Sequence, residues 1–353
     1  MLPELYRDLP LDPARKEIRV LTLASGDGDT PLECTLKTIS LGDKSIRFSA
    51  LSYVWGDPAD TTIINVNNVH VPVTKSLAGA LSSLKNCLTP RLRKEFIWAD
   101  AICINQQDIA ERTQQVRSMA EIYSTASHVI VWLGDGNQHT DLAISMMCSP
   151  GFRAGLDGER APTRDEIKVD VVLKHDLCKR QWWQRLWVRQ EFVLATRAWD
   201  YPELQNLWAE CRKEVTGFED DVPTTKGIHP ISLDNIYRLY HRNGPFSLPY
   251  AVRYVLRNSI ATNALDFIYG LLGLLQDSDR DRITLDYNME PMELFQQVSN
   301  ILWREHHWFM LGDLLPILEF QPDEKNIPRG CPILQRSQLG AGRTTALYRL
   351  KVY

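Results

Sequence analysis

The sequence predicts an α/β fold, with a parallel β-sheet in the first half of the chain and helices in most of the rest. Three segments rich in β-branched and aromatic residues have the composition of strands: 46–56, 96–104 and 128–134. Amphipathic helical patterns separate them, and such an alternation is typical of a parallel sheet with right-handed crossovers. From about residue 230 onward, the apolar residues recur mainly at helical spacing.

Length and composition set the domain organisation that we expect. The chain has 353 residues, with 40 basic and 44 acidic side chains and a formal net charge of −4. At roughly 150 residues per domain, this length corresponds to about two domains. We expect an N-terminal segment (1–45), an α/β domain (46–200) and a mostly helical C-terminal region (201–353). A hydrophobic share of 44% and a charged share of 24% exclude a disordered or collagen-like chain.

Several classes of site and partner are not expected from this sequence. The longest apolar run, 268–275, is far shorter than the roughly 20 residues of a membrane span, and the first residues lack the apolar core of a secretory signal. We therefore expect a cytoplasmic protein. The seven cysteines form no Cys-x-x-Cys pair or zinc-ligand cluster, and the balanced charge argues against a nucleic-acid partner. Gly-x-Ser-x-Gly, Walker and His-Glu-x-x-His motifs are absent from the sequence.

The first strand runs into a turn at Gly56-Asp57-Pro58. Two short apolar runs around Asn67-Asn68 predict a hairpin over 63–73. Ser76 suits the N-cap of the next helix, because apolar residues follow it at helical spacing.

The second strand, 96–104, is apolar on both faces except at Asp100, as a central strand covered by helices would be. An unpaired buried carboxylate is costly, so Asp100 must find donors or lie near the carboxyl end of its strand, where open α/β sheets bind ligands. Cys103, Asn105 and Gln106 would emerge at the same edge. These residues either form a reactive, ligand-binding group or tie down loops and fill the core.

Asp108 to Glu111 has the spacing of a capping box and starts a predicted helix that ends near Ala126. The third strand, 128–134, is of the same buried kind as the second. An exposed loop is then expected at 149–166, followed by a helix over 183–196. After a polar stretch near 212–230, helices are expected in four further segments. These segments are 232–242, 248–260, 262–275 and 291–306.

Glu191 stands four residues after Trp187 in the helix predicted over 183–196. A carboxylate desolvated beside an indole has a raised pKa, which makes it useful as an acid or base near neutral pH. The other interpretation is a packed amphipathic helix whose Glu191 pairs with Arg185 or Arg189.

Five of these segments form an ordered set of motifs: Leu51 to Gly56, Trp98 to Gln106, Glu111 to Ala126, Val129 to Gly134 and Arg185 to Glu191. Together they resemble the fungal heterokaryon-incompatibility (HET) domain, and 261–274 is similar to a stretch that follows the domain in many members. Departures from the family pattern occur at Ala99, Gln181, Arg189 and Asn263-Ala264, and none removes a polar residue of the main blocks.

The resemblance implies a role in fungal nonself recognition and programmed cell death, with protein partners in signalling or self-association. HET domains are also distantly similar to Toll/interleukin-receptor (TIR) domains, which have a flavodoxin-like parallel sheet. Several TIR domains cleave NAD at the glycosidic bond with a helical Glu, and Glu191 occupies the matching position. The implied activity is that of a hydrolase with NAD as a nucleotide-like substrate. The implied catalytic residues are Glu191, Asp100 and Cys103, and the implied ligand-binding residues are Tyr53, Trp55, Asn105, Gln106, Arg112, Arg185 and Trp187.

Two other functions fit the same residues. One is a biosynthetic or other metabolic enzyme that reuses the fold, with Asp100, Cys103 or Glu191 as acid, base or nucleophile. The other is a non-catalytic interaction module whose polar residues are architectural. An enclosed pocket containing Asp100 and Glu191 would favour an enzyme, and a flat exposed surface would favour the module.

Overall fold

The chain forms two compact units, residues 1–288 and 289–353. The computed structural model describes the following residues: 2–24, 31–87, 95–147, 176–195, 230–256, 259–307, 313–314, 333–335 and 349–351. The predicted loop at 149–166, most of the polar stretch near 212–230 and most of the last twenty residues lie outside them.

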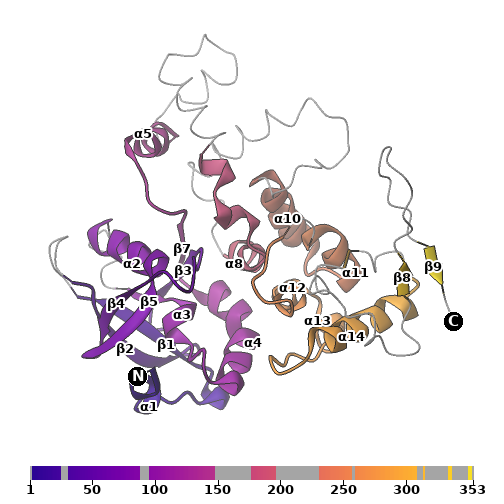
Figure 1. Ribbon diagram of the computed structural model, residues 1–353, viewed down its shortest axis with the longest axis horizontal. Coiled ribbons are helices and arrows are strands. Elements are labelled where there is room, and N and C mark those ends of the chain that lie inside the picture. The colour runs from indigo at the N-terminus through magenta and orange to yellow at the C-terminus, as the bar shows by residue number, and fades with distance from the viewer. Residues whose placement is uncertain are drawn as a thin grey trace, which may run out of the picture. The chain divides into compact units, whose positions relative to one another are not determined.

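A seven-stranded sheet forms the N-terminal part of the first unit (Figure 1). Its strands, in spatial order, are β5 (Val69–Thr74), β4 (Thr61–Val66), β2 (Glu33–Ser40), β1 (Glu17–Leu23), β6 (Phe96–Trp98), β3 (Phe48–Tyr53) and β7 (His128–Trp132). The three predicted strands, β3, β6 and β7, pair in parallel, which confirms the α/β class. The sheet as a whole is mixed, because β1 runs antiparallel to both β2 and β6. Sequence patterns had not indicated β1 and β2, which lie within the first 45 residues.

The helices around this sheet are α1 (Leu2–Arg7), η1 (Pro13–Arg15), α2 (Lys75–Cys87), α3 (Asp100–Cys103), α4 (Ile109–Thr125) and α5 (Gln138–Met147). Helix α2 contacts β3, β4 and β5. The predicted hairpin is confirmed, since β4 and β5 are joined through Asn67 and Asn68, both with positive φ. Thr74, not Ser76, accepts the hydrogen bond from the Leu77 amide at the start of α2. The Ser76 hydroxyl instead donates to the carbonyl of Val54.

Two predictions about the parallel strands were wrong in detail. Strand β6 ends at Trp98 rather than at residue 104, because Asp100 to Cys103 form a helical turn whose Cys103 amide donates to the Ala99 carbonyl (2.8 Å). Asp100 therefore lies just beyond the carboxyl end of β6. Strand β7 is mostly half-buried rather than buried, because it lies at the edge of the sheet and, among the described strands, pairs with β3 alone.

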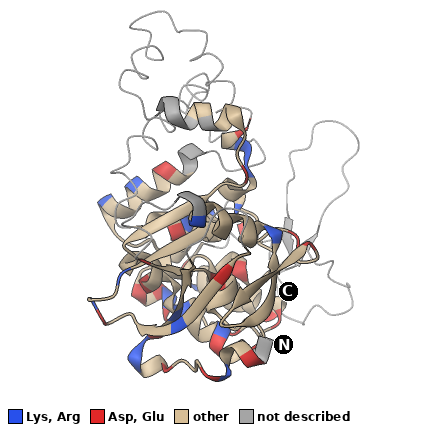
Figure 2. Ribbon diagram, turned by 90° about the vertical axis from the view of Figure 1, so that its left-hand side faces the viewer, with Lys and Arg blue, Asp and Glu red and all other residues tan. Residues whose placement is uncertain are grey.

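The other described elements of the first unit are helices: η3 (Leu177–Lys179), η4 (Gln181–Gln184), α8 (Trp187–Val193), α10 (Pro230–Asn243), α11 (Leu248–Tyr250), the π-helix η5 (Ala251–Val255), α12 (Asp266–Tyr269), η6 (Leu272–Leu274) and α13 (Asp277–Arg280). Helix α8 contacts α4, α10, η4 and η6, so it joins the α/β part to the following helices. The single helix predicted over 262–275 is divided into α12 and η6. Acidic and basic residues are interspersed over the described elements in the view of Figure 2.

The second unit contains α14 (Pro291–Arg304), β8 (Ile333–Gln335) and β9 (Arg349–Lys351), with β8 and β9 antiparallel. The helix predicted over 291–306 is confirmed by α14, and its apolar stripe is buried: Leu294, Phe295, Val298, Ile301 and Leu302. None of the described helices is long and apolar enough to span a membrane.

Candidate functional site

Glu191 lies on α8, where every residue from Val188 to Val193 is buried. Its side chain is 2% exposed and accepts a hydrogen bond from the hydroxyl of Ser52, a residue of β3. The Trp182 indole in turn donates to the Ser52 hydroxyl oxygen (Nε1 to Oγ, 2.8 Å). Glu191 pairs with Arg185 at 4.0 Å (Nη1 to Oε1), which resolves the choice between the two arginines, since Arg189 donates to backbone carbonyls.

The proton affinity of Glu191 is the most distinctive electrostatic feature of the site. Burial raises the pKa of its carboxyl to about 7, the Arg185 charge and the Ser52 hydrogen bond oppose the rise, and Asp100 adds to it. Glu191 is thus close to half protonated at neutral pH, which is the condition for an effective general acid or base.

Asp100 lies half-buried at the start of α3. Its carboxylate accepts hydrogen bonds from the Trp55 indole (Nε1 to Oδ2, 2.7 Å) and from the Ala101 amide (2.8 Å). Burial raises the pKa of Asp100, while Arg185 and Trp55 oppose the rise. The aspartate has therefore found the donors that burial of its charge requires.

Tyr53, the last residue of β3, connects the two acids. Its carbonyl accepts a hydrogen bond from the Arg185 guanidinium. Its hydroxyl is buried and interacts with the Asp100 carboxylate. Burial holds the pKa of Tyr53 well above its usual value, with a further rise from Asp100 and Glu191. Tyr53 thus stays a neutral phenol beside the carboxylates, whereas Trp55 is 40% exposed at the edge of the site.

Three predicted site residues support the turn after β6. The Cys103 thiol is fully buried and accepts a hydrogen bond from the Ala99 amide, and burial raises its pKa to about 12. Such a thiol lacks the low pKa of a nucleophile. The Gln106 side chain donates to the backbone carbonyl of Asp100 (2.9 Å), and the backbone N–H of Asn105 donates to the Glu111 carboxylate (2.7 Å).

Glu111 explains why this turn is fixed. Asp108 caps α4 as predicted, by accepting from the Glu111 amide, but the Glu111 carboxylate turns away and binds Arg19 of β1 at 2.6 and 2.9 Å. Arg19 also donates to the carbonyl of Cys103. This ion pair between β1 and α4 could not be foreseen, because β1 itself was not predicted.

Arg112 and Trp187 converge on a different acid, Asp266 of α12. Asp266 accepts hydrogen bonds from Tyr287 (2.7 Å) and from Trp187, and the Arg112 guanidinium lies 3.7 Å from the centre of the Tyr287 ring. Burial raises the pKa of Asp266, and the charges of Arg112 and Arg185 oppose it. Arg185 therefore interacts electrostatically with Asp100, Glu191 and Asp266.

The predicted site is therefore divided between three places. Tyr53, Trp55, Asp100, Arg185 and Glu191 form one group, which we call the acidic site, together with Ser52 and Trp182. Sequence reasoning did not single out Ser52 or Trp182 as site residues. Ser52 stands in the Leu-Ser-Tyr motif at the end of β3, which was the one available signal for it. Among the described residues, no group of three or more His, Cys, Asp or Glu side chains could hold a metal ion.

Comparison with known proteins bears on the same residues. Residues 48–191 match the family model "Heterokaryon incompatibility protein (HET)", a match that starts at the first residue of β3 and ends at Glu191. The chain is 27% identical to "Heterokaryon incompatibility protein 6, OR allele" of Neurospora crassa, over 84% of this chain and 53% of that protein. It thus spans about half the length of this curated relative. No solved structure matches the chain. Residues 48–191 therefore form a HET domain.

Proposed function

We propose that this chain acts in fungal nonself recognition, where its HET domain causes cell death through chemistry at Glu191 in the cytoplasm, under the control of protein partners. Two findings support the general role: the HET match over residues 48–191 and the similarity to a Neurospora protein named for heterokaryon incompatibility.

One observation carries the proposal of chemistry: Glu191 is 2% exposed and has a pKa of about 7. Strongly perturbed acids concentrate at functional sites, because catalysis needs groups that exchange protons near the working pH. The position agrees with this, since Ser52, Tyr53 and Asp100 all lie at the carboxyl ends of parallel strands, where α/β sheets bind ligands.

The reaction that we propose is hydrolysis of NAD at its glycosidic bond. As the bond from the ribose carbon to the nicotinamide nitrogen breaks, nicotinamide leaves with the electron pair, and the Glu191 carboxylate stabilises the positive charge that develops on the sugar. Water then adds to the ribose carbon and loses a proton to Glu191, which releases it to solvent. The exposed ring of Trp55 offers a surface for stacking, and Asp100 holds that ring through its indole nitrogen.

The low exposure of Glu191 favours a second candidate, a non-catalytic interaction module. In that case Ser52, Trp182 and Glu191 form a buried polar network that specifies the packing of α8 on the sheet. The two candidates differ in one respect: only the enzyme needs the carboxylate itself. A metabolic enzyme acting on another substrate would need the same carboxylate as the NAD hydrolase.

Purified protein incubated with NAD, with nicotinamide release followed by chromatography, tests the reaction. Glu191→Gln keeps the shape of the protonated acid and should lower release by about a hundredfold or more. The matched control is Glu121→Gln, which changes a glutamate of α4 whose side chain is 40% exposed, and it should leave the rate unchanged. Absence of turnover by the wild type, also after forced oligomerisation, would exclude NAD as the substrate.

Expression of the same three proteins in a fungal host separates the general role from the reaction. We expect the wild type and Glu121→Gln to reduce colony survival and Glu191→Gln to restore it. Equal killing by folded Glu191→Gln would assign the death signal to an interaction module. Survival with all three would contradict the general role.

A further inference from the structure

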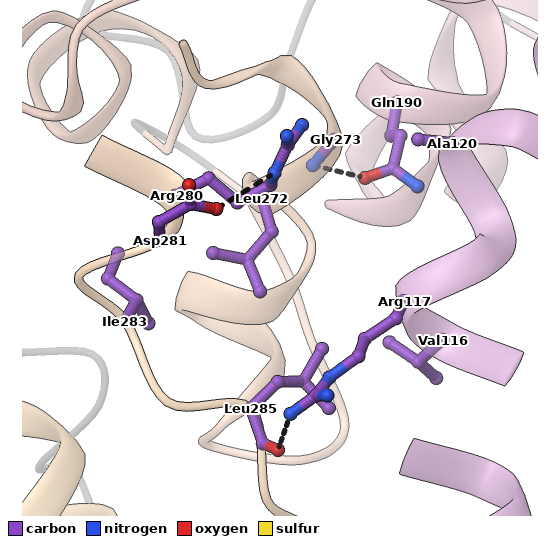
Figure 3. A pocket seen from close by; sticks show the side chains of 10 residues that line it. All are labelled: Val116, Arg117, Ala120, Gln190, Leu272, Gly273, Arg280, Asp281, Ile283 and Leu285. Atoms are coloured by element: carbon purple, nitrogen blue, oxygen red, sulfur yellow. Dashed lines mark hydrogen bonds and ion pairs between the residues drawn. The ribbon is translucent and has the colours of Figure 1, made fainter. Parts of the chain in front are cut away.

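A cavity of about 490 Å³ lies between α4 and the segment from η6 to Leu285 (Figure 3). Helix α4 contributes Val116, Arg117 and Ala120, and α8 contributes Gln190. The volume falls within the roughly 300–1,000 Å³ that is usual for small-molecule sites. Neither Asp100 nor Glu191 lines this cavity.

The interior of the cavity is apolar. Val116, Leu272, Ile283 and Leu285 line it, and each is less than a tenth exposed. A ligand body that replaced water against these side chains would gain about 25 cal/mol for each Å² of apolar surface buried. The cavity therefore favours a ligand with a hydrocarbon or aromatic body.

Two arginines line the cavity, and among the described residues only one of them, Arg280, has a carboxylate partner. Arg280 pairs with Asp277 (2.6 Å) and Asp281 (4.0 Å). The Arg117 guanidinium donates one hydrogen bond, to the Leu285 carbonyl (3.2 Å), and forms no ion pair with the described residues. Figure 3 shows Arg117 reaching across from α4 to this carbonyl. Its remaining donors suit the carboxylate of a ligand, which a guanidinium binds with two parallel hydrogen bonds.

Close contact at Gly273 fixes the end of the cavity. The Gly273 amide donates to the Gln190 side-chain oxygen (3.0 Å). A Cβ at position 273 would meet that oxygen and would come within 2.8 Å of the Ala120 Cβ. Because Gly273 has no side chain, α4, α8 and η6 pack closely at this end of the cavity. This part of the cavity wall is therefore formed without a ligand.

We propose that this cavity is a binding site for a small monoanion with an apolar body, such as a medium-chain or aromatic carboxylate. Arg117 binds the carboxylate, and the apolar residues of α4, η6 and the 283–285 segment enclose the body. The site is separate from the proposed reaction, and its test does not depend on activity.

Isothermal titration calorimetry of the full chain with octanoate tests the site, with octanamide as the uncharged probe of the same length. We expect saturable binding of one octanoate and binding of octanamide that is about tenfold weaker. Arg117→Gln should abolish the preference for octanoate. Arg7→Gln, which removes an exposed arginine on α1, is the matched control and should bind as the wild type does.

Leu272→Trp, which fills the cavity from η6, should weaken both probes. Because this variant could fail to fold, Arg117→Gln remains the deciding comparison. Absence of saturable octanoate binding to the wild type, equal affinity for the two probes, or an unchanged preference in Arg117→Gln would each overturn the proposal.

Discussion

Glu95 and Glu191 are both buried, and both accept a hydrogen bond from a serine of β3, but at opposite ends of that strand. Ser49 donates to Glu95 near the amino end (3.0 Å), and Ser52 donates to Glu191 near the carboxyl end. Burial raises the pKa of both. At Glu95 the hydrogen bonds from Ser49 and His128 and the neighbouring charges outweigh burial, so its pKa lies below the usual value. At Glu191 burial prevails and the pKa is about 7.

The difference shows what makes a buried acid inert or reactive. Glu95 has two further partners at 3.2 Å, Arg47 and His128, whereas the one arginine near Glu191 is 4.0 Å away and Asp100 adds negative charge. At the amino ends of the parallel strands, the fully hydrogen-bonded carboxylate of Glu95 thus connects β3, β6 and β7. The carboxyl ends hold a carboxylate that exchanges its proton near neutral pH, as a ligand-binding edge requires.

The pH dependence of stability should separate the two acids most strongly. The pKa of Glu191 is raised on folding, so the folded state keeps a proton that the unfolded state loses. The free energy of unfolding of the wild type, relative to that of Glu191→Gln, should therefore decrease by on the order of 3 kcal/mol between about pH 4.5 and pH 7. Above pH 7 the difference between the two proteins should stay constant. Urea unfolding across this range measures the difference. A constant difference would show that Glu191 titrates normally.

Glu95→Gln should have the opposite dependence and a smaller effect. The lowered pKa of Glu95 gives stability that is present above the unfolded value and lost as pH falls through the folded value. We expect a loss of about 2 kcal/mol at pH 7, because charge-assisted hydrogen bonds from Arg47 and His128 disappear. Unfolding at pH 7 and below pH 4 checks this expectation, which a loss independent of pH would contradict.

Neighbours of Glu191 should move its titration in opposite directions. Asp100→Asn removes a negative charge and should lower the Glu191 pKa, whereas Arg185→Gln removes a positive charge and should raise it. Each change should be on the order of one pKa unit, or about 1.4 kcal/mol. The pH at which the Glu191-dependent decrease in stability ends reports the pKa of Glu191 in the folded protein. If both variants moved this pH in the same direction, Asp100 and Arg185 would not be the opposing charges that act on Glu191.

Trp55→Phe should have the smallest effect. It removes the indole hydrogen bond to Asp100 and keeps most of the exposed ring, so we expect a loss of about 0.5–1 kcal/mol. The pKa of Asp100 should rise, since that bond lowers it. Carboxyl NMR of the wild type and of Trp55→Phe measures the pKa of Asp100 in each protein. An unchanged Asp100 pKa would show that the hydrogen bond does not form in solution.

Local patterns predicted the parts of the fold that local chemistry determines. The parallel strands β3 and β7, the hairpin at Asn67-Asn68 and α4 follow from apolar periodicity and turn residues. Strand β6 was predicted too long, because an apolar run does not distinguish a strand from the buried helical turn after Trp98. Strands β1 and β2 were not expected, because their pairing with distant strands, and not a clear local pattern, places them in the sheet.

The candidate site was only partly predictable for the same reason. Glu191 and Asp100 attracted attention as carboxylates in apolar surroundings. Their partners depend on contacts across the chain: Ser52 lies 139 residues before Glu191, and Trp182 lies 130 residues after Ser52. Trp187, the indole expected beside Glu191, binds Asp266 instead. Spacing within one helix could place the residues near one another but could not assign their partners.

Glu191, unlike Glu95, should hold a proton near neutral pH. A pH titration of the folded protein with ¹³C-labelled glutamate carboxyls, assigned by Glu191→Gln and Glu95→Gln, tests it most directly. We predict a midpoint near 7 for Glu191 and one below the usual glutamate value for Glu95. Midpoints at or below the usual glutamate value for both residues would show that Glu191 is ionised at neutral pH, as Glu95 is, and is not a group that exchanges its proton there.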